Sequence, residues 1–196
     1  PVTALLDLDG FKLVNDHYGH FVGDRLIKTC GTLLREVCGS DARIYRLGGD
    51  EFTVVLNQLD SAESAGVVAR RLIDTLAQPM TIEGHELVIT PSIGIAIAPD
   101  DADTVEGLLK AADKALYHCK TSGKNKFMYY SSSMEAADVD RLALETDLRK
   151  AMERKDLVLH YQPQIDTLTG AVVGAEALMR WQHPELGLIP PFKFIP

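Results

Sequence analysis

The chain has 196 residues and a net charge of −8, from 20 basic and 28 acidic side chains. This acidic balance argues against binding a long nucleic acid through its phosphates, which needs a basic surface, but it allows a single nucleotide held through a metal ion. The sequence contains no apolar run long enough to span a membrane, and its cysteines, Cys30, Cys38 and Cys119, have neither a zinc-site nor a CxxC spacing.

The first elements alternate between strand and helix. Residues 2–8 read as a buried strand that ends in an acidic run, and apolar residues at spacings of three and four predict a helix over 24–37. Two β-rich runs, 42–47 and 52–56, flank Gly48 and Gly49 and predict a hairpin.

The following elements continue that alternation. Helical spacing predicts helices over 65–76 and 105–119, and a turn is expected at 83–86. Small residues alternate with isoleucines over 92–97, so one face of this strand should allow close packing. A last strand is expected over 126–130. The order predicts an α/β (α+β) fold in which helices cover a mixed or antiparallel sheet.

The chain then changes character. Residues 131–138 form a small polar stretch that we interpret as a linker between a domain over 1–130 and a second segment over 139–196. A charged amphipathic helix is expected over 139–154, and the pattern beyond Asp156 is again that of strands. The second segment therefore begins a separate structural unit.

Acidic residues follow two predicted strands, and two glycines precede one of the acidic pairs. Asp7 ends the first strand, and Asp50 and Glu51 follow the glycine turn. Neighbouring strands lie about 4.8 Å apart, so carboxylates at their ends can share a cation such as magnesium. The glycines would let a nucleotide approach the backbone. Alternatively, Gly48 and Gly49 merely supply a hairpin turn and the acids are solvated.

Several motifs occur together and in order. They are Asp7–Asp16, Gly19-His20, Gly23-Asp24, Arg46–Phe52, Ser92–Ala96, Ala112–Tyr117, and Lys120 with Gly123, Lys124 and Asn125. This set resembles the signature of GGDEF diguanylate cyclases over residues 1–130. The resemblance implies a mixed sheet flanked by helices with a ferredoxin-like core, similar to the palm of nucleotidyl cyclases and polymerases.

The resemblance also implies roles for the acidic residues. Asp7, the main-chain carbonyl of Leu8, and Asp50 would hold Mg²⁺ or Mn²⁺. Glu51 would assist metal binding or deprotonate the attacking 3′-hydroxyl, which makes Asp50 and Glu51 the candidate catalytic residues.

Other positions would contact the nucleotide. Asn15 and Asp24 would hydrogen-bond the guanine edge and so select GTP, although Asn15 alone is equally typical of a turn or cap. Lys12, Lys120 and Lys124 would face the phosphates, and Gly48 and Gly49 would line the substrate site. Lys120 and Lys124 would share one helical turn if the helix continues that far. Lysine at position 124, where the family often has arginine, keeps the charge but loses the bidentate fork.

The expected reaction condenses two GTP into cyclic di-GMP and two pyrophosphates, so two sites must face each other in a homodimer. A silent GTP-binding module that regulates an attached domain, and a pure interaction module, remain alternatives. Scattered cysteines favour a reducing cytoplasm, with tethering of the full-length protein through upstream domains left open.

Two departures from the family pattern affect the expectations. The family's Arg-x-x-Asp product site is replaced by Gly39-Ser40-Asp41-Ala42, so product inhibition through it is not expected. The usual upstream helix and Asn-Arg turn do not precede Pro1, which we expect to weaken the activity of this chain.

The second segment resembles the start of an EAL phosphodiesterase domain. The motifs are Leu159–Gln164, Gly174–Leu178, Met179–Trp181, His183-Pro184 and Phe194–Pro196. The resemblance implies that Glu176 binds a metal and that Gln162 and Arg180 approach cyclic di-GMP. A (β/α)₈ barrel of this type typically needs about 250 residues. Residues 139–196 can therefore form only its beginning, and no phosphodiesterase activity is expected from them.

Overall fold

The computed structural model describes residues 1–57 and 61–195, without the side chains of residues 62, 136–143 and 192. Pro196, the last residue of the EAL-like motifs, lies outside this range. The chain divides into two compact units, Pro1–Met134 (the N-terminal unit) and Glu135–Pro196 (the C-terminal unit). Within the described residues, no helix combines the length and the apolar character that crossing a bilayer requires.

The N-terminal unit is built on a mixed sheet. Its strands are β1 (Val2–Asp9), β2 (Ala42–Gly48), β3 (Glu51–Leu56), β6 (Thr90–Ile97) and β7 (Phe127–Tyr129). They lie in the order β2-β3-β1-β6-β7, in which only β6 and β7 run parallel. The central strand β1 is therefore flanked by β3 and β6, and the predicted mixed sheet is confirmed.

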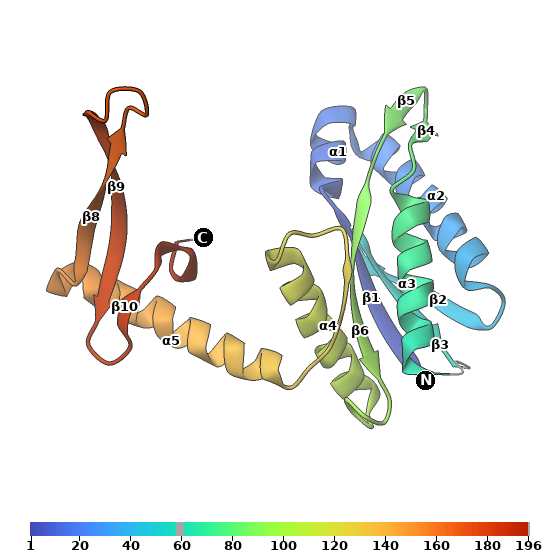
Figure 1. Cartoon of the computed structure of the whole chain (residues 1–196). Helices are drawn as coiled ribbons and strands as arrows, with labels where there is room; N and C mark the ends of the chain where they lie inside the picture. Colours follow the sequence, from blue (N-terminus) through green and yellow to red (C-terminus); the bar gives the residue numbers. More distant parts are fainter. Residues whose placement is uncertain (58–60, 196) are drawn as a thin grey trace. The chain divides into compact units, whose positions relative to one another are not determined.

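Helices cover both faces of this sheet (Figure 1). They are α1 (Phe11–Tyr18), α2 (His20–Cys38), α3 (Ala62–Leu76) and α4 (Val105–Thr121). Alternate residues of β1, such as Leu6 and Leu8, join the large core with α2 and α3, whereas Leu5 packs with α4. Because side chains alternate across a strand, Asp7 and Asp9 lie on the α4 face with Leu5.

The strand β6 shows why its small residues matter. A Cβ atom built on Gly94 would lie 2.1 Å from the main-chain oxygen of Ala112 in α4. Only glycine therefore permits this separation of α4 and the sheet, as the alternation of small residues predicted. The predicted turn at 83–86 is also present, between β4 (Met80–Ile82) and β5 (His85–Leu87).

The short helix α1 was not predicted from periodicity. It follows directly after Gly10, which has a left-handed φ of 80°. Phe11 is buried and Val14 packs against the core, whereas Leu13 is 71% exposed. An eight-residue helix presents only one narrow face to the core, and Leu13 lies off that face.

The C-terminal unit consists of one long helix and a small antiparallel sheet. The helix α5 (Ser133–Arg154) begins inside the stretch interpreted as a linker. The sheet has the order β10-β9-β8, from β8 (Leu157–Ile165), β9 (Val172–His183) and β10 (Gly187–Ile189), and a 3₁₀ turn, η1 (Pro191–Lys193), follows. A small core gathers Ala151, Trp181 and Ile189. The described residues form strands of the EAL segment, but no barrel.

Candidate active site

The acidic residues of the candidate site meet where β1 ends and β3 begins. In this antiparallel pair Asp7 lies directly opposite Glu51, and the Leu8 N–H donates to the main-chain oxygen of Asp50 over 3.4 Å. Directly paired residues place their side chains on the same face of a sheet. The sequence prediction that Asp7 and the Asp50-Glu51 pair come from neighbouring strand ends therefore agrees with the pairing.

A lysine from α4 reaches this strand end. The Lys120 Nζ lies 2.7 Å from Asp7 Oδ2, and Asp7 is only 8% exposed. Burial raises the pKa of Asp7, an effect that the hydrogen bond and charge of Lys120 oppose and that the charges of Asp50 and Asp9 reinforce. Several carboxylates therefore lie close together around the buried Asp7, and their negative charge favours a positively charged partner.

The glycine turn between β2 and β3 is held by an arginine that sequence reasoning assigned no role. The register shifts between Arg46 and Gly48, and Gly49 adopts a left-handed φ of 52°. The Arg46 side chain donates from Nε and Nη2 to the Gly49 carbonyl oxygen, over 3.0 and 2.7 Å. This double contact fixes the turn that precedes Asp50. The sequence signal for this contact was the position of Arg46, three residues before the second glycine of the turn.

The chemistry of these donors decides whether a divalent cation fits. Among the described residues, no three His, Cys, Asp or Glu side chains converge as a metal site on their own. Magnesium, however, commonly takes one or two carboxylates together with substrate phosphates. The ammonium group of Lys120 is a stand-in cation, already bound to Asp7. The arrangement therefore fits a metal that is completed by a nucleotide.

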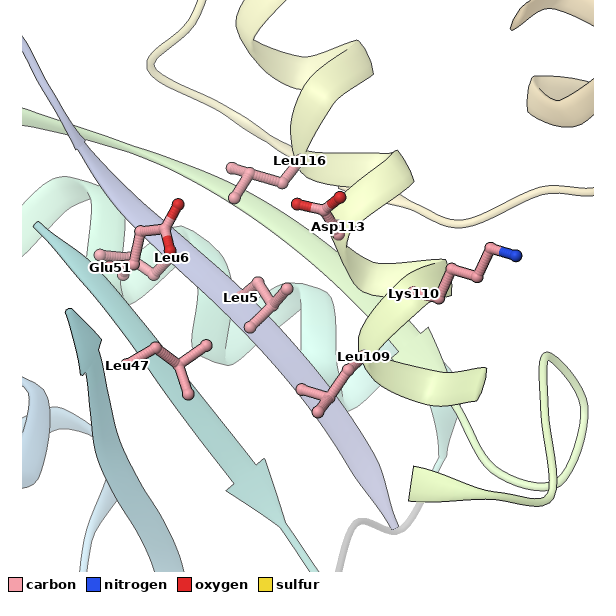
Figure 2. A pocket seen from close by; sticks show the side chains of 8 residues that line it. All are labelled: Leu5, Leu6, Leu47, Glu51, Leu109, Lys110, Asp113 and Leu116. Carbon is pink, nitrogen blue, oxygen red and sulfur yellow. The ribbon is translucent and has the colours of Figure 1, made fainter. Parts of the chain in front are cut away.

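Glu51 borders a pocket of about 290 Å³ between the sheet and α4 (Figure 2). Leucines from β1, β2 and α4 line most of it: Leu5, Leu6, Leu47, Leu109 and Leu116. Glu51 from β3 and Asp113 from α4 supply carboxylates at opposite sides, and the Lys110 ammonium extends away from the leucines. The exposed carboxylate of Glu51 is thus accessible beside an apolar wall.

A second group of predicted residues lies on the helix pair α1–α2. Asn15 belongs to α1, where its main-chain oxygen accepts the N–H of Gly19, and the exposed Asp24 belongs to α2. A Cβ on Gly23 would lie 1.9 Å from Asn15 Oδ1, so the Asn15 amide packs directly on the backbone of α2. The contact brings Asn15 beside the residue that precedes Asp24. Gly23 is a positioning residue whose only sequence signal was its place in the motif.

The three lysines predicted to face phosphates have different environments. Lys12 is exposed on α1, whereas Lys120 is paired with Asp7. The helix α4 ends at Thr121, and Lys124 follows with a left-handed φ of 58°. Lys120 and Lys124 were expected to share one helical turn only if the helix continued that far, and this condition is not met because α4 ends before Gly123. Both lysines nevertheless lie at the C-terminal end of α4.

The second acid of the first motif, Asp9, does not share the environment of Asp7. Its Oδ1 accepts from Ser92 Oγ over 2.8 Å, and its Oδ2 accepts from Thr90 Oγ1 over 2.9 Å and from the Asn125 N–H over 3.1 Å. Sequence reasoning gave Asp9 no role. The Asp-x-Asp spacing was its only signal.

The residues of the C-terminal unit lie on one strand pair. Gln162 of β8 is directly opposite Glu176 of β9, and Arg180 follows on the same strand, opposite Val158. Gln162 and Glu176 are exposed, and the Arg180 Nη1 donates to the Met179 oxygen over 2.9 Å. The three residues predicted for the EAL segment therefore occupy one face of one hairpin by strand alternation.

Comparisons with known proteins agree with both units. The family profile described as "Diguanylate cyclase, GGDEF domain" matches residues 2–126, and the EAL domain profile matches residues 145–196. The chain is 44% identical over 194 residues to a bifunctional diguanylate cyclase/cyclic di-GMP phosphodiesterase, MucR, of Pseudomonas aeruginosa. That match covers 99% of this chain and 28% of the relative. A cyclic di-GMP phosphodiesterase of Escherichia coli, PdeR, is 40% identical, with 98% of this chain and 29% of the relative covered.

Solved structures match the N-terminal unit. The isolated GGDEF domain of the Pseudomonas aeruginosa protein TpbB (YfiN) has a TM-score of 0.68 at 31% identity, and covers 69% of this chain and 80% of its own. An EAL/GGDEF domain protein from M. capsulatus has a TM-score of 0.63 at 42% identity, covering 66% of this chain and 84% of its own. The chain spans between a quarter and a third of the length of the curated relatives named above. It belongs to the GGDEF diguanylate cyclase domain family and continues into part of an EAL domain.

Proposed function

We propose that the N-terminal unit is an active diguanylate cyclase that condenses two GTP into cyclic di-GMP and two pyrophosphates. The observation that carries this proposal is the position of Asp7 opposite Glu51 and beside Asp50, with the Lys120 ammonium group paired with Asp7. Family membership and the intact Gly48–Phe52 run support it. The attacking group would be the 3′-hydroxyl of one GTP, and the reacting centre the α-phosphorus of the other.

A divalent cation, Mg²⁺ or Mn²⁺, would be held by Asp7, the Leu8 carbonyl and Asp50, with Glu51 assisting. When bound, it supplies charge stabilisation at the phosphoryl oxygens and lowers the pKa of the attacking hydroxyl. The exposed Glu51 carboxylate would accept the proton of that hydroxyl. The turn fixed by Arg46 would keep Asp50 in place and leave room over Gly48 and Gly49 for the triphosphate.

Substrate selection would come from the α1–α2 pair and the lysines. Asn15 and Asp24 present a fixed set of donors and acceptors to the guanine edge, and a base with the wrong pattern would leave them unpaired. Lys12, Lys120 and Lys124 would balance the triphosphate charge. Lys120 would exchange its contact with Asp7 for a phosphate contact when a metal-bound nucleotide enters.

One such site binds one GTP, so the proposed reaction requires two sites to face each other. A symmetric homodimer supplies that arrangement and turns a bimolecular step into a positioned one. The chain would therefore make product only under conditions in which it dimerises. The cytoplasm, where GTP is available, is the proposed location of both units.

A regulatory role is the second candidate, and one specific observation favours it. A relative that is 40% identical across both units carries the name of a phosphodiesterase rather than a cyclase. In this alternative the N-terminal unit binds GTP without turning it over and controls the attached EAL domain. Residues 145–196, with Gln162, Glu176 and Arg180, would be the first part of that domain and would have no hydrolytic activity by themselves.

One experiment separates these candidates. The chain is incubated with GTP and Mg²⁺ at concentrations at which ultracentrifugation shows a dimer, and cyclic di-GMP is quantified by chromatography. Product formation supports the cyclase, tight GTP binding without product supports the regulatory module, and absence of GTP binding excludes both. Addition of cyclic di-GMP to the same sample should yield no linear product, because the hydrolytic domain is incomplete.

A further inference from the structure

The two acids of the Asp7-Leu8-Asp9 run perform different tasks. Both lie on the α4 face of β1, and a two-carboxylate metal site would use them together. Asp7 is paired with the Lys120 ammonium, whereas both oxygens of Asp9 accept from neutral donors of the protein. A cation at Asp9 would have to displace these donors. Asp9 is therefore already fully engaged in structural contacts.

The contacts of Asp9 join three segments that are distant in sequence. Thr90 and Ser92 belong to the start of β6, and Asn125 lies in the loop after α4, 116 positions from Asp9. Ser92 is completely buried. The Asp9 carboxylate thus links β1, β6 and the loop after α4 at the end of the sheet on which the proposed catalytic groups lie.

The loop that Asp9 holds is conformationally strained. Lys124 and Asn125 both have left-handed φ angles, 58° and 47°, which non-glycine residues adopt rarely and at a cost. Such conformations persist when surrounding contacts over-determine them. Here the Lys124 N–H donates to the Cys119 oxygen, the Asn125 N–H donates to Asp9, and the Cys119 thiol donates to the Lys126 oxygen.

We infer that Asp9 is a positioning residue that holds the loop after α4 in its strained conformation and thereby presents Lys124 to the triphosphate of GTP. This inference rests on the proposed function, because it takes Lys124 as a phosphate contact. Asp9 acts through the main chain of Asn125 and does not ligate the metal. The strain at Lys124 and Asn125 is the cost of this presentation, and the Asp9 contact offsets it.

The test compares four versions of the full chain: the unaltered protein, Asp9→Ala, Lys124→Met, and the double variant. Alanine is used at position 9 because an asparagine oxygen could still accept from the Asn125 N–H. Affinity for GTP is measured by calorimetry with Mg²⁺, and affinity for Mn²⁺ alone by electron paramagnetic resonance. Asp9→Ala and Lys124→Met should each weaken GTP binding by about tenfold, within the range that supporting contacts usually contribute. The double variant should be no weaker than either single variant, because both changes remove the same interaction.

Lys124→Met should leave Mn²⁺ binding without nucleotide within about twofold, since Lys124 is not a ligand. Asp9→Ala should weaken Mn²⁺ binding by less than it weakens GTP binding, because Asp9 acts on Asp7 only through its charge. In steady-state kinetics the loss should be in KM rather than kcat. An additive double variant, or a loss of Mn²⁺ affinity in Asp9→Ala that equals or exceeds its loss of GTP affinity, would overturn the inference.

Amide hydrogen exchange gives a readout that does not depend on activity. The Asn125 amide should exchange faster in Asp9→Ala, and at an unchanged rate in Ser92→Ala, which removes a different Asp9 contact. Unchanged exchange at Asn125 in Asp9→Ala would refute the role of Asp9 even if GTP binding fell. If the unaltered chain binds no GTP, the proposed function fails, and the exchange rate still decides whether Asp9 holds the loop.

Discussion

The two units of the chain bury their apolar surface to very different degrees. The N-terminal unit has a sheet covered on both faces, with a continuous core that extends from β1 to α2, α3 and β6. The C-terminal unit has a core gathered around Trp181, while Leu159, Tyr161 and Met179 remain exposed on its strands. The N-terminal unit therefore covers both faces of its own sheet, whereas the described strands of the C-terminal unit leave several large apolar side chains uncovered.

The largest expected effect is a loss of catalysis that should be confined to the N-terminal unit. Asp50→Asn should reduce cyclic di-GMP formation by roughly 10³-fold, since it removes a charge from the proposed metal site and such charges are worth several kcal/mol. The fluorescence of Trp181, the single tryptophan, should not change. Full activity in Asp50→Asn would remove Asp50 from the proposed metal set, and an altered Trp181 spectrum would show that the units are coupled.

Two core substitutions, one in each unit, should have opposite outcomes. Gly94→Ala forces a methyl group against the Ala112 oxygen and should cost about 1–3 kcal/mol or more. Trp181→Ala should cost about 3–5 kcal/mol. A typical domain has a reserve of about 5–15 kcal/mol, whereas a core as small as that of the C-terminal unit supplies at most about 3–5 kcal/mol.

We therefore expect Gly94→Ala to fold with reduced stability and Trp181→Ala to lose the structure of the C-terminal unit. Hydrogen exchange at Ile95 and at Leu178 measures the two units separately. Protection from hydrogen exchange that persists at Leu178 in Trp181→Ala would contradict the expected difference in stability between the two units. Val88→Ala, a small change at a side chain that is 63% exposed, is the control for the N-terminal unit.

A smaller effect concerns the Lys120 ammonium group, which is paired with Asp7. Lys120→Met removes the ammonium that occupies Asp7, so Mn²⁺ alone should bind about tenfold more tightly, as expected for one competing charge in a half-buried site. GTP should bind more weakly, because a phosphate partner is lost. Lys110→Met, on the exposed part of α4, should change neither affinity. Weaker Mn²⁺ binding in Lys120→Met would mean that this lysine supports the metal instead of competing with it.

The smallest effect is a pH dependence confined to the C-terminal unit. Hydrogen bonds from Lys150 and then His183 hold the pKa of Asp147 below its usual 3.8. A carboxyl group with a lowered folded pKa stabilises the fold above its unfolded pKa, and this contribution disappears as the pH falls through the folded value. Trp181 fluorescence, which reports on the adjacent His183, should therefore change below about pH 4. The same change in Asp147→Asn would rule out this carboxylate as its cause.

Much of the N-terminal unit could be predicted because its signals are local. Helical spacing gave the core faces of α2, α3 and α4, and the glycine pair gave the hairpin of β2 and β3. Cys30 of α2 and Cys119 of α4 are fully buried on these faces. The short helix α1 escaped prediction because eight residues provide too few turns for periodicity to register.

The candidate site was only partly predictable, for a different reason. Asp7 pairs with Lys120 and Asp9 with Asn125. The members of each pair lie far apart in the sequence, and no local pattern encodes such contacts. The end of α4 before Gly123 likewise changed the relation of Lys120 to Lys124. Motif resemblance located the residues, but their partners required the fold.

The contact between Gly23 and Asn15 has a consequence for how base preference can change. Because the Asn15 amide lies against bare backbone, a single methyl group at position 23 would collide with Asn15 Oδ1 and displace the amide that is proposed to meet the guanine edge. Under the proposed function, the preference for guanine would therefore depend on the spacing of α1 and α2, two helices that carry none of the proposed metal ligands.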